Sequence, residues 1–197
     1  MMTGKERWLA AVRMQPVDRL PFWPKLNAAY PPAQAAPFRQ MTVDQIQQWI
    51  GADRHLGVGG CVRLAHKRCS VQSTTADLVQ TTLYRTPSGT LERVNRFDLA
   101  SQSWHPVKHP VHNVEDVRLM RAVFEDVSVE LDQEALEKSR RRAAEIGQDA
   151  VTTGAIGTTP LMEWIQHMAG VETGHHLLAD EREEVEALFA AVQRVLA

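Results

Sequence analysis

The chain contains little cysteine: Cys61 and Cys69 are the two cysteines among its 197 residues. A single pair cannot form the disulfide framework that holds many small secreted domains together. The seven residues between the two cysteines also do not match the spacing of a zinc knuckle. We therefore expect a cytoplasmic protein, without a metal site at these cysteines.

The sequence also lacks a charge excess and a long hydrophobic run. Its 22 Lys and Arg and 24 Asp and Glu give a net charge of −2, which provides no general attraction to nucleic acid or to a membrane surface. No apolar stretch approaches the roughly 20 residues that a membrane-spanning helix needs, and none has the pattern of a signal peptide. We expect partners that are neither nucleic acid nor membrane.

An amphipathic helix is predicted over residues 3–14, at the start of the chain. Thr3 can cap its first turn, and Glu6 stands three positions later, as in a capping box. Pro16 prevents an easy continuation, and the residues after it turn the chain into an extended segment. The residues expected to share the apolar face are Trp8, Leu9 and Val12.

Short strands and one clear hairpin are predicted in the middle of the chain. A short helix over residues 43–50, capped by Thr42, comes first. The hairpin spans residues 77–98; Pro87 suits the first position of its turn and Gly89 a positive φ. Neither face of the returning strand is strongly apolar, which predicts an edge strand or a solvent-facing sheet.

The second half of the chain has the helix–strand rhythm of an α/β fold. Helices are predicted over residues 114–123, 133–146, 160–169 and 180–196, and a buried strand over residues 149–154. The expected N-caps of three of these helices are Asn113, Asp132 and Asp180, and Gly147 is the expected stop after the second. The last helix carries an apolar stripe made of Val185, Leu188, Phe189 and Val192.

The loop after the strand at 149–154 is a candidate ligand site. A loop that follows the carboxyl end of a parallel strand is where α/β folds place ligands, although a tight strand-to-helix connection would have the same sequence. Glu163 lies in the first turn of the helix that begins at Pro160. A carboxylate there can act as an acid or base, or bind an amine; it can also simply complement the helix dipole.

Clustered histidines and arginines offer weaker candidates. Histidines close in sequence can ligate zinc, but no cysteine or carboxylate stands beside these at a recognisable spacing, so we expect solvated or hydrogen-bonded side chains. The histidines concerned are His105, His109, His112, His175 and His176. Arg140, Arg141 and Arg142 lie around one helix rather than along a stripe, and are expected to face solvent.

Three segments together resemble the uroporphyrinogen decarboxylase superfamily, which also contains cobalamin-dependent methyltransferases. The opening "KERWLAAVRMQPVDRLPFWP" resembles the family's short helix, "x-P-x-D-R-x-P" turn and extended aromatic segment; here the turn is residues 16–21. "YRTPSGTLERV" resembles the "TPxGTL" hairpin of the decarboxylase-like and methyltransferase-like branches. "GAIGTTPLMEWIQHMAGVETGHHLLADEREEVEALF" resembles the family's βα unit. The matched pieces lie between residues 5 and 189.

The resemblance implies a fold and a division of the chain. The expected fold class is α/β, the N-terminal portion of a TIM-type (β/α) barrel, preceded by an α+β lobe that contains the hairpin. Residues 1–112 would form the lobe and residues 113–197 the start of the barrel. In this arrangement Trp8 and the turn at residues 16–21 pin the first helix against the barrel.

The resemblance also implies an activity. True porphyrinogen decarboxylases follow the turn with an arginine-rich segment, whereas here Lys25 is the one cation between the turn and Arg39. Several cations are needed to hold a substrate with many carboxylates. The expected function is therefore corrinoid-dependent methyl transfer from a small methylated substrate. Two alternatives remain open: decarboxylation of a porphyrinogen or related acid, and a non-catalytic half-barrel that self-associates or binds a partner.

The cofactor and site expectations follow from this family. Its methyltransferases carry their zinc ligands in the C-terminal half, so a corrinoid protein and zinc are implied for the complete enzyme, and no metal is expected on this chain. Glu163 is the expected catalytic residue, and substrate is expected to contact Trp23, Lys25, Asn27, Thr158 and Thr159. A half-barrel would expose sheet edges and the stripe of helix 180–196, so we expect a homo-oligomer or association with a missing C-terminal half.

Overall fold

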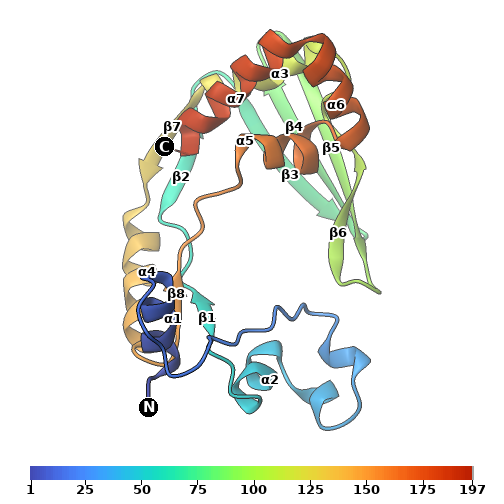
Figure 1. Cartoon of the computed structure of the whole chain (residues 1–197). Helices are drawn as coiled ribbons and strands as arrows, with labels where there is room; N and C mark the ends of the chain where they lie inside the picture. Colours follow the sequence, from blue (N-terminus) through green and yellow to red (C-terminus); the bar gives the residue numbers. More distant parts are fainter. Residues whose placement is uncertain (197) are drawn as a thin grey trace. The chain divides into compact units, whose positions relative to one another are not determined.

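The structure is a computed structural model that describes residues 1–196. The chain divides into two compact units, each built from segments that are distant in sequence (Figure 1). The first unit takes residues 1–61, 100–102 and 131–155, and the second takes residues 62–99, 103–130 and the chain from residue 156 onward. Both units combine helices with strands, which confirms the mixed α/β class. The described strands form three separate sheets, and none of these closes into a barrel.

The first unit contains helices and one pair of parallel strands. Its elements are α1 (Gly4–Val12), two 3₁₀ helices, η1 (Pro31–Ala33) and η2 (Phe38–Gln40), α2 (Val43–Trp49), β1 (His55–Gly57), α4 (Gln133–Ile146) and β8 (Val151–Thr153). β1 pairs with β8 in parallel, with His55 opposite Val151. Parallel strands need a crossover connection; here the chain between the two strands holds residues 62–99 and 103–130 of the second unit and then α4.

The caps of the first unit agree with the sequence, but the buried face of α1 does not. Thr3 and Glu6 form the expected capping box, and a second capping box begins α2. The prediction of an apolar inner face on α1 is wrong: the side chain of Val12 is 75% exposed and Leu9 is 36% exposed. Arg7 and Ala10 are buried instead, because α1 turns its guanidinium toward a buried carboxylate.

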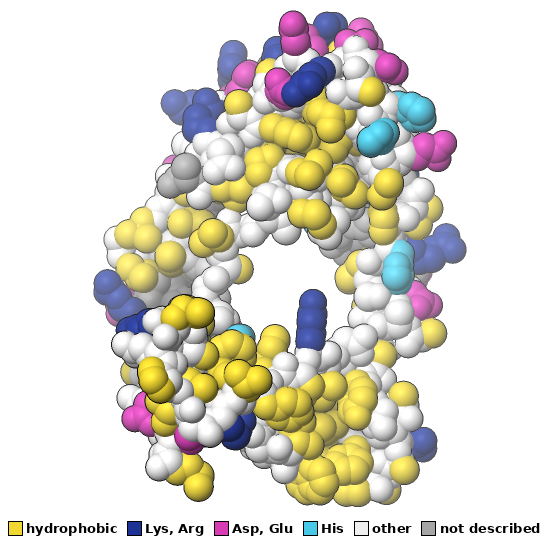
Figure 2. Space-filling model, viewed as in Figure 1, with side chains coloured by type: hydrophobic (Ala, Val, Ile, Leu, Met, Phe, Trp, Pro, Cys, Tyr) yellow, Lys and Arg dark blue, Asp and Glu magenta, His cyan; other side chains and the backbone are white. Residues whose placement is uncertain are grey.

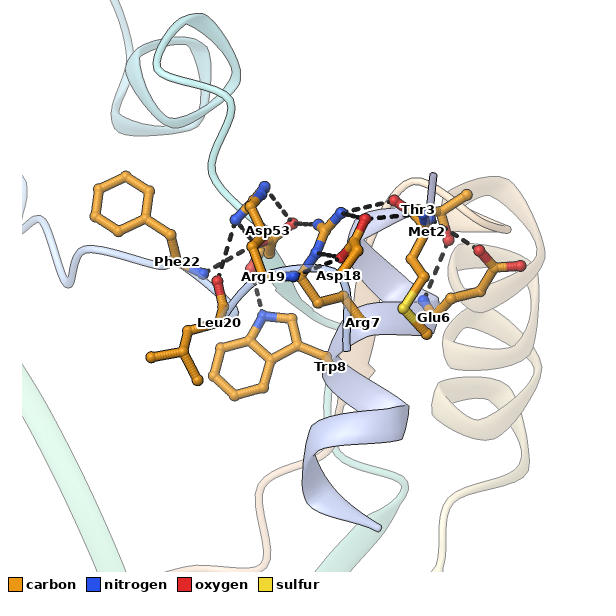
Figure 3. A network of polar contacts seen from close by, with 10 residues as sticks. All are labelled: Met2, Thr3, Glu6, Arg7, Trp8, Asp18, Arg19, Leu20, Phe22 and Asp53. Atoms are coloured by element: carbon orange, nitrogen blue, oxygen red, sulfur yellow. Dashed lines mark hydrogen bonds and ion pairs between the residues drawn. The ribbon is translucent and has the colours of Figure 1, made fainter. Parts of the chain in front are cut away.

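That carboxylate belongs to Asp53, which is 3% exposed and joins four segments of the first unit (Figure 3). One carboxylate oxygen accepts hydrogen bonds from the guanidinium groups of Arg7 and Arg19. The other accepts from Arg19 Nη1 at 2.7 Å and from the Phe22 backbone N–H at 2.8 Å. The backbone carbonyl of Asp53 accepts from the indole N–H of Trp8 at 2.6 Å. Every oxygen of this buried residue is thus paired, as a buried charge requires.

Asp18 extends the network to the turn at residues 16–21. Its two oxygens accept from Arg7 Nε at 2.6 Å and Arg7 Nη2 at 3.0 Å. Chiefly because of this hydrogen bonding to Arg7, the pKa of Asp18 lies well below its usual range. The pKa of Arg7 is raised for the same reason. The Asp-Arg pair of the turn therefore binds the helix on one side and Asp53 on the other.

The extended segment after the turn is held against β1. The ring of His55 lies between two indoles, stacked on Trp23 at a centroid distance of 4.7 Å and edge-on to Trp8 at 4.3 Å. Burial lowers the pKa of His55. On the other side, the amide of Gln47 donates to the Pro24 carbonyl at 3.0 Å.

The second unit contains a four-stranded antiparallel sheet and a group of helices. Its elements are β2 (Val62–His66), β3 (Ser70–Ala76), β4 (Val79–Thr86), β5 (Gly89–Asp98), β6 (Ser103–Lys108), α3 (Val114–Glu125), β7 (Val127–Leu131), α5 (Pro160–Glu163), a π-helical turn η3 (Trp164–Met168), α6 (Val171–Asp180) and α7 (Arg182–Leu196). β3, β4, β5 and β6 are neighbours in that order, and β2 pairs with β7. Leu131, the last residue of β7, is assigned to the first unit.

The predicted hairpin is β4–β5, but two details of the prediction are wrong. β5 is an interior strand, since β4 and β6 flank it, and its Leu91 is 4% exposed. Gly89 does not adopt a positive φ; it pairs with Thr86 across a two-residue turn. A Cβ at Gly89 would lie 3.0 Å from a methyl carbon of Leu119, so glycine is needed there for the close approach of α3. The sequence of β5 did not indicate this burial, because most of the apolar residues that pack around Leu91 come from helices.

The last helix buries its stripe instead of exposing it. Val185, Leu188 and Val192 are at most 3% exposed and belong to a core shared with α3 and η3. Asp180 is not its cap, because this residue ends α6 and α7 begins at Arg182. The expectation that the stripe of this helix is exposed is therefore wrong, and the expected homo-oligomer stays a prediction. No described helix is both long enough and apolar enough to cross a membrane.

A variant of the buried carboxylate should destabilise the protein far more than a variant of a surface carboxylate. We expect Asp53→Asn to lower the free energy of unfolding by about 3–5 kcal/mol, because two guanidinium groups lose their shared buried partner. The matched control is Asp44→Asn, since Asp44 is half exposed and pairs with Arg54 at 2.6 Å; its expected cost is about 1 kcal/mol or less. Urea unfolding measures both, and equal losses would contradict the role given to Asp53.

Candidate functional site

Glu163 and Thr158 form a hydrogen-bonded pair at the start of α5. The hydroxyl of Thr158 donates to a carboxylate oxygen of Glu163 at 2.7 Å. Pro160 occupies the first position of the helix, where its missing N–H costs nothing. The backbone N–H of Glu163 donates to the carbonyl of Thr159 at 2.9 Å, which closes the first turn. Glu163 is half-buried, and its carboxylate can act as an acid, a base or an amine-binding group.

The loop that leads into α5 is packed against the end of α7. Gly157 has a φ of 94°, a conformation that favours glycine. A Cβ there would lie 2.7 Å from a methyl carbon of Leu196. This glycine therefore allows the loop to pass close to the helix while Thr158 reaches Glu163.

Tyr84 on β4 lies within electrostatic range of Glu163. Burial is the main cause of its raised pKa; the charge of Arg93 acts in the opposite direction and the charge of Glu163 adds to the increase. Tyr84 pairs with Leu91 across the sheet, and Arg93 follows two positions later on the same face. The negative charge of Glu163 and the positive charge of Arg93 therefore act on the same phenol in opposite directions.

Arg93 and His109 each bury a nitrogen atom that has no hydrogen-bond partner. The atoms are Arg93 Nε and His109 Nδ1, and none of the ion pairs found among residues 1–196 includes Arg93. The pKa of His109 is lowered by burial and, to a smaller extent, by His112, His167 and Arg93. The side chain of His109 is half-buried, and the chain at Gly170 packs against the Cδ2 and Nε2 atoms of its ring.

A cavity of about 520 Å³ opens beside these residues, within the second unit. It lies between the sheet, from which Asn95 and Trp104 contribute, and the segment that includes His109 and η3. Its size falls within the range of small-molecule sites. The lining residues are Asn95, Trp104, Pro106, His109, Ile165, Gln166, His167, Gly170 and Val171.

The three predicted substrate-binding residues of the first unit differ in their contacts and in their exposure to solvent. Trp23 stacks on His55 and buries its indole nitrogen without a partner. Lys25 is exposed, and Asn27 accepts a hydrogen bond from the N–H of Ala29 at 3.1 Å, as in a local turn. Figure 2 shows hydrophobic side chains gathered on the surface around this segment and α2; the exposed ones include Phe22, Tyr30 and Trp49.

Of the six predicted site residues, the structure brings Thr158, Thr159 and Glu163 together at the start of α5. Trp23, Lys25 and Asn27 belong to the other unit, and their convergence with the first three stays a prediction. Sequence reasoning gave no role to Tyr84 or Arg93, and it considered His109, which lines the cavity, only as a weak candidate for a zinc ligand. The alternation of side chains along β4 and β5 places Tyr84, Leu91 and Arg93 on one face of the sheet. No residue near them in the sequence indicates that helices pack on that face.

Comparison with known proteins adds no relative. No family model matches the chain, and no curated protein or solved structure does either. Among the described residues, no three His, Cys, Asp or Glu side chains are grouped so that they could hold a metal ion.

Titration of one phenol tests the arrangement around Glu163. The chain has two tyrosines, Tyr30 and Tyr84, so a Tyr30→Phe background leaves one to follow by ultraviolet difference absorbance. Glu163→Gln should lower the pKa of Tyr84, because a negative charge that opposes the phenolate is removed. Arg93→Met should raise it. Glu172→Gln, on the exposed start of α6, should leave it unchanged; an unmoved pKa in Glu163→Gln would rule out the proximity.

Proposed function

We propose that the chain forms the front portion of a uroporphyrinogen decarboxylase-like (β/α) barrel that transfers a methyl group between a small methylated substrate and a corrinoid. The observation that carries this proposal is the parallel pairing of β1 with β8. Neighbouring strands of a (β/α) barrel run parallel and are joined by helical crossovers. Two strands more than ninety residues apart in sequence, with α3 and α4 between them, fit that pattern.

The residues that carry the family resemblance also support the proposal. Asp18 and Arg19, the central pair of the "x-P-x-D-R-x-P" turn, bind Arg7 and Asp53. The turn therefore has a structural task, which is to join the first helix to the start of β1. The "TPxGTL" segment forms the tight β4–β5 turn, with Gly89 close to α3.

Glu163 is the proposed acid–base residue. A substrate that gives up a methyl cation keeps the bonding electron pair on its nitrogen, oxygen or sulfur atom, which then takes up a proton. A carboxylic acid at Glu163 can supply that proton, and the Thr158 hydroxyl orients the carboxyl group. Thr159, Trp23, Lys25 and Asn27 complete the proposed substrate site. A separate corrinoid protein would present the methyl acceptor, and zinc would activate a thiolate acceptor when ligands from a C-terminal half are present.

The alternatives differ in the charge and surface that they need. Decarboxylation of a porphyrinogen needs several cations around the substrate carboxylates, and Lys25 alone stands in the segment where the family has arginines. A non-catalytic role through self-association has support from the exposed Phe22 and Trp49, which are 50% and 65% exposed. The proposal of a methyltransferase also includes a cytoplasmic location and a homo-oligomeric state.

Methyl transfer can be measured directly on the full chain. We expect the chain to accelerate methylation of cob(I)alamin by one member of a panel of methylated amines, alcohols and thiols, followed by the absorbance change of the corrinoid. Glu163→Gln should reduce the rate by about 10²-fold or more, the usual effect of losing a general acid. Glu172→Gln is the matched control and should keep the rate.

Two other results would redirect the assignment. Carbon dioxide release from a porphyrinogen, with no methyl transfer, would favour the decarboxylase alternative. Absence of both reactions, together with a concentration-dependent oligomer in sedimentation, would favour the non-catalytic half-barrel.

A further inference from the structure

The cavity of the second unit contains none of the residues proposed for methyl transfer. We propose that it binds a small molecule with a flat apolar body and one carboxylate or similar anionic group. This inference goes beyond the proposed function and does not depend on it. It rests on the shape of the cavity, the charges around it and two buried nitrogen atoms that have no partner.

The shape comes from the register of the sheet. Asn95 pairs with Pro106 and Phe97 pairs with Trp104 across β5 and β6, so these side chains share one face. The rings of Phe97 and Trp104 meet edge to face at a centroid distance of 5.3 Å. Trp104 lines the cavity together with Ile165 and Val171, and these side chains give it apolar walls. A volume of about 520 Å³ accommodates a body of two fused rings.

The charges around the cavity favour an anion. The lining residues include no Asp or Glu. Arg93 lies two positions from Asn95 on the same face of β5, and its positive charge acts on His109. Its buried Nε has no hydrogen-bond partner. None of the ion pairs found among residues 1–196 includes Arg93, and the cavity lining has no acidic residue. This combination suits a ligand that brings its own negative charge.

His109 supplies a fixed polar group at the cavity wall. A Cβ at Gly170 would lie 3.0 Å from both Cδ2 and Nε2 of the imidazole, so the backbone holds the ring in place. Nδ1 is left buried and unpaired. Three neighbours, His112, His167 and Arg93, oppose the protonated form of the ring. An anionic ligand would offset these charges, so its binding should raise the pKa of His109.

A charged and a neutral probe of the same shape test the proposal. We expect 2-naphthoate to bind the full chain at one site with a dissociation constant on the order of 0.1–1 mM, from the usual efficiency of ligands of this size. 2-Naphthamide, which is uncharged, should bind about fivefold more weakly or worse. Isothermal titration calorimetry measures both. No saturable binding of 2-naphthoate, or equal affinity for the two probes, would overturn the proposal.

Two arginines on opposite faces of β5 provide matched variants. Arg93→Met keeps an apolar stem and removes the charge beside the cavity; it should weaken 2-naphthoate about fivefold and leave 2-naphthamide unchanged. Arg96→Met changes an exposed residue on the other face of the same strand and should leave both affinities unchanged. Equal losses in the two variants would contradict a role for Arg93.

Two further measurements do not depend on the folding of Arg93→Met. In the unmodified chain, 2-naphthoate should shift the indole N–H resonance of Trp104 and raise the pKa of His109 in a proton NMR titration. Its affinity should accordingly strengthen as the pH falls through that pKa, since the imidazolium is the form that the anion favours. Val171→Trp, at a rim position that is 73% exposed, should block the cavity and abolish binding; retained binding would place the ligand elsewhere.

Discussion

The buried carboxylate of Asp53 is the constraint on which the first unit depends. A charge that is 3% exposed must be matched by opposite charge and by hydrogen bonds, because its desolvation is otherwise too costly. This requirement turns Arg7 rather than an apolar residue inward, draws Arg19 back from the turn and fixes the backbone of Phe22. The first helix, the turn, the extended segment and the start of β1 consequently act as one structural element (Figure 3).

The second unit treats its buried polar groups differently. At the Leu91 end, the face of the sheet is covered by α3 and its contacts are apolar. At the Asn95 end, the helices leave a cavity, and Arg93 and His109 keep nitrogen atoms without partners. Full pairing offsets the desolvation cost of the Asp53 carboxylate, whereas an unpaired donor beside a cavity can still bind a ligand. This contrast separates the structural role of Asp53 from the functional roles proposed for the second unit.

Local features of the chain were predictable because they depend on neighbouring residues. The capping box at Thr3, the caps at Thr42, Asn113 and Asp132 and the stop at Gly147 are all found. The hydrogen bond between Thr158 and Glu163 joins residues only five positions apart, so it also depends on neighbouring residues. The exposure of Val12, the interior position of β5 and the burial of the α7 stripe were not, because each depends on a segment that is distant in sequence.

The sequence by itself did not indicate β7 or α6, but it determined the mixed α/β class, the β4–β5 hairpin and the place of the loop that carries Glu163. Hydrophobic period, caps and turn residues encode these through contacts between residues a few positions apart. Only the tertiary structure decided that Asp53 gathers Arg7 and Arg19, that the charges of Glu163 and Arg93 act on Tyr84, and that His109 lines the cavity. Such groupings follow from burial, which depends on what the rest of the chain places over a given face, and no local pattern in the sequence records it.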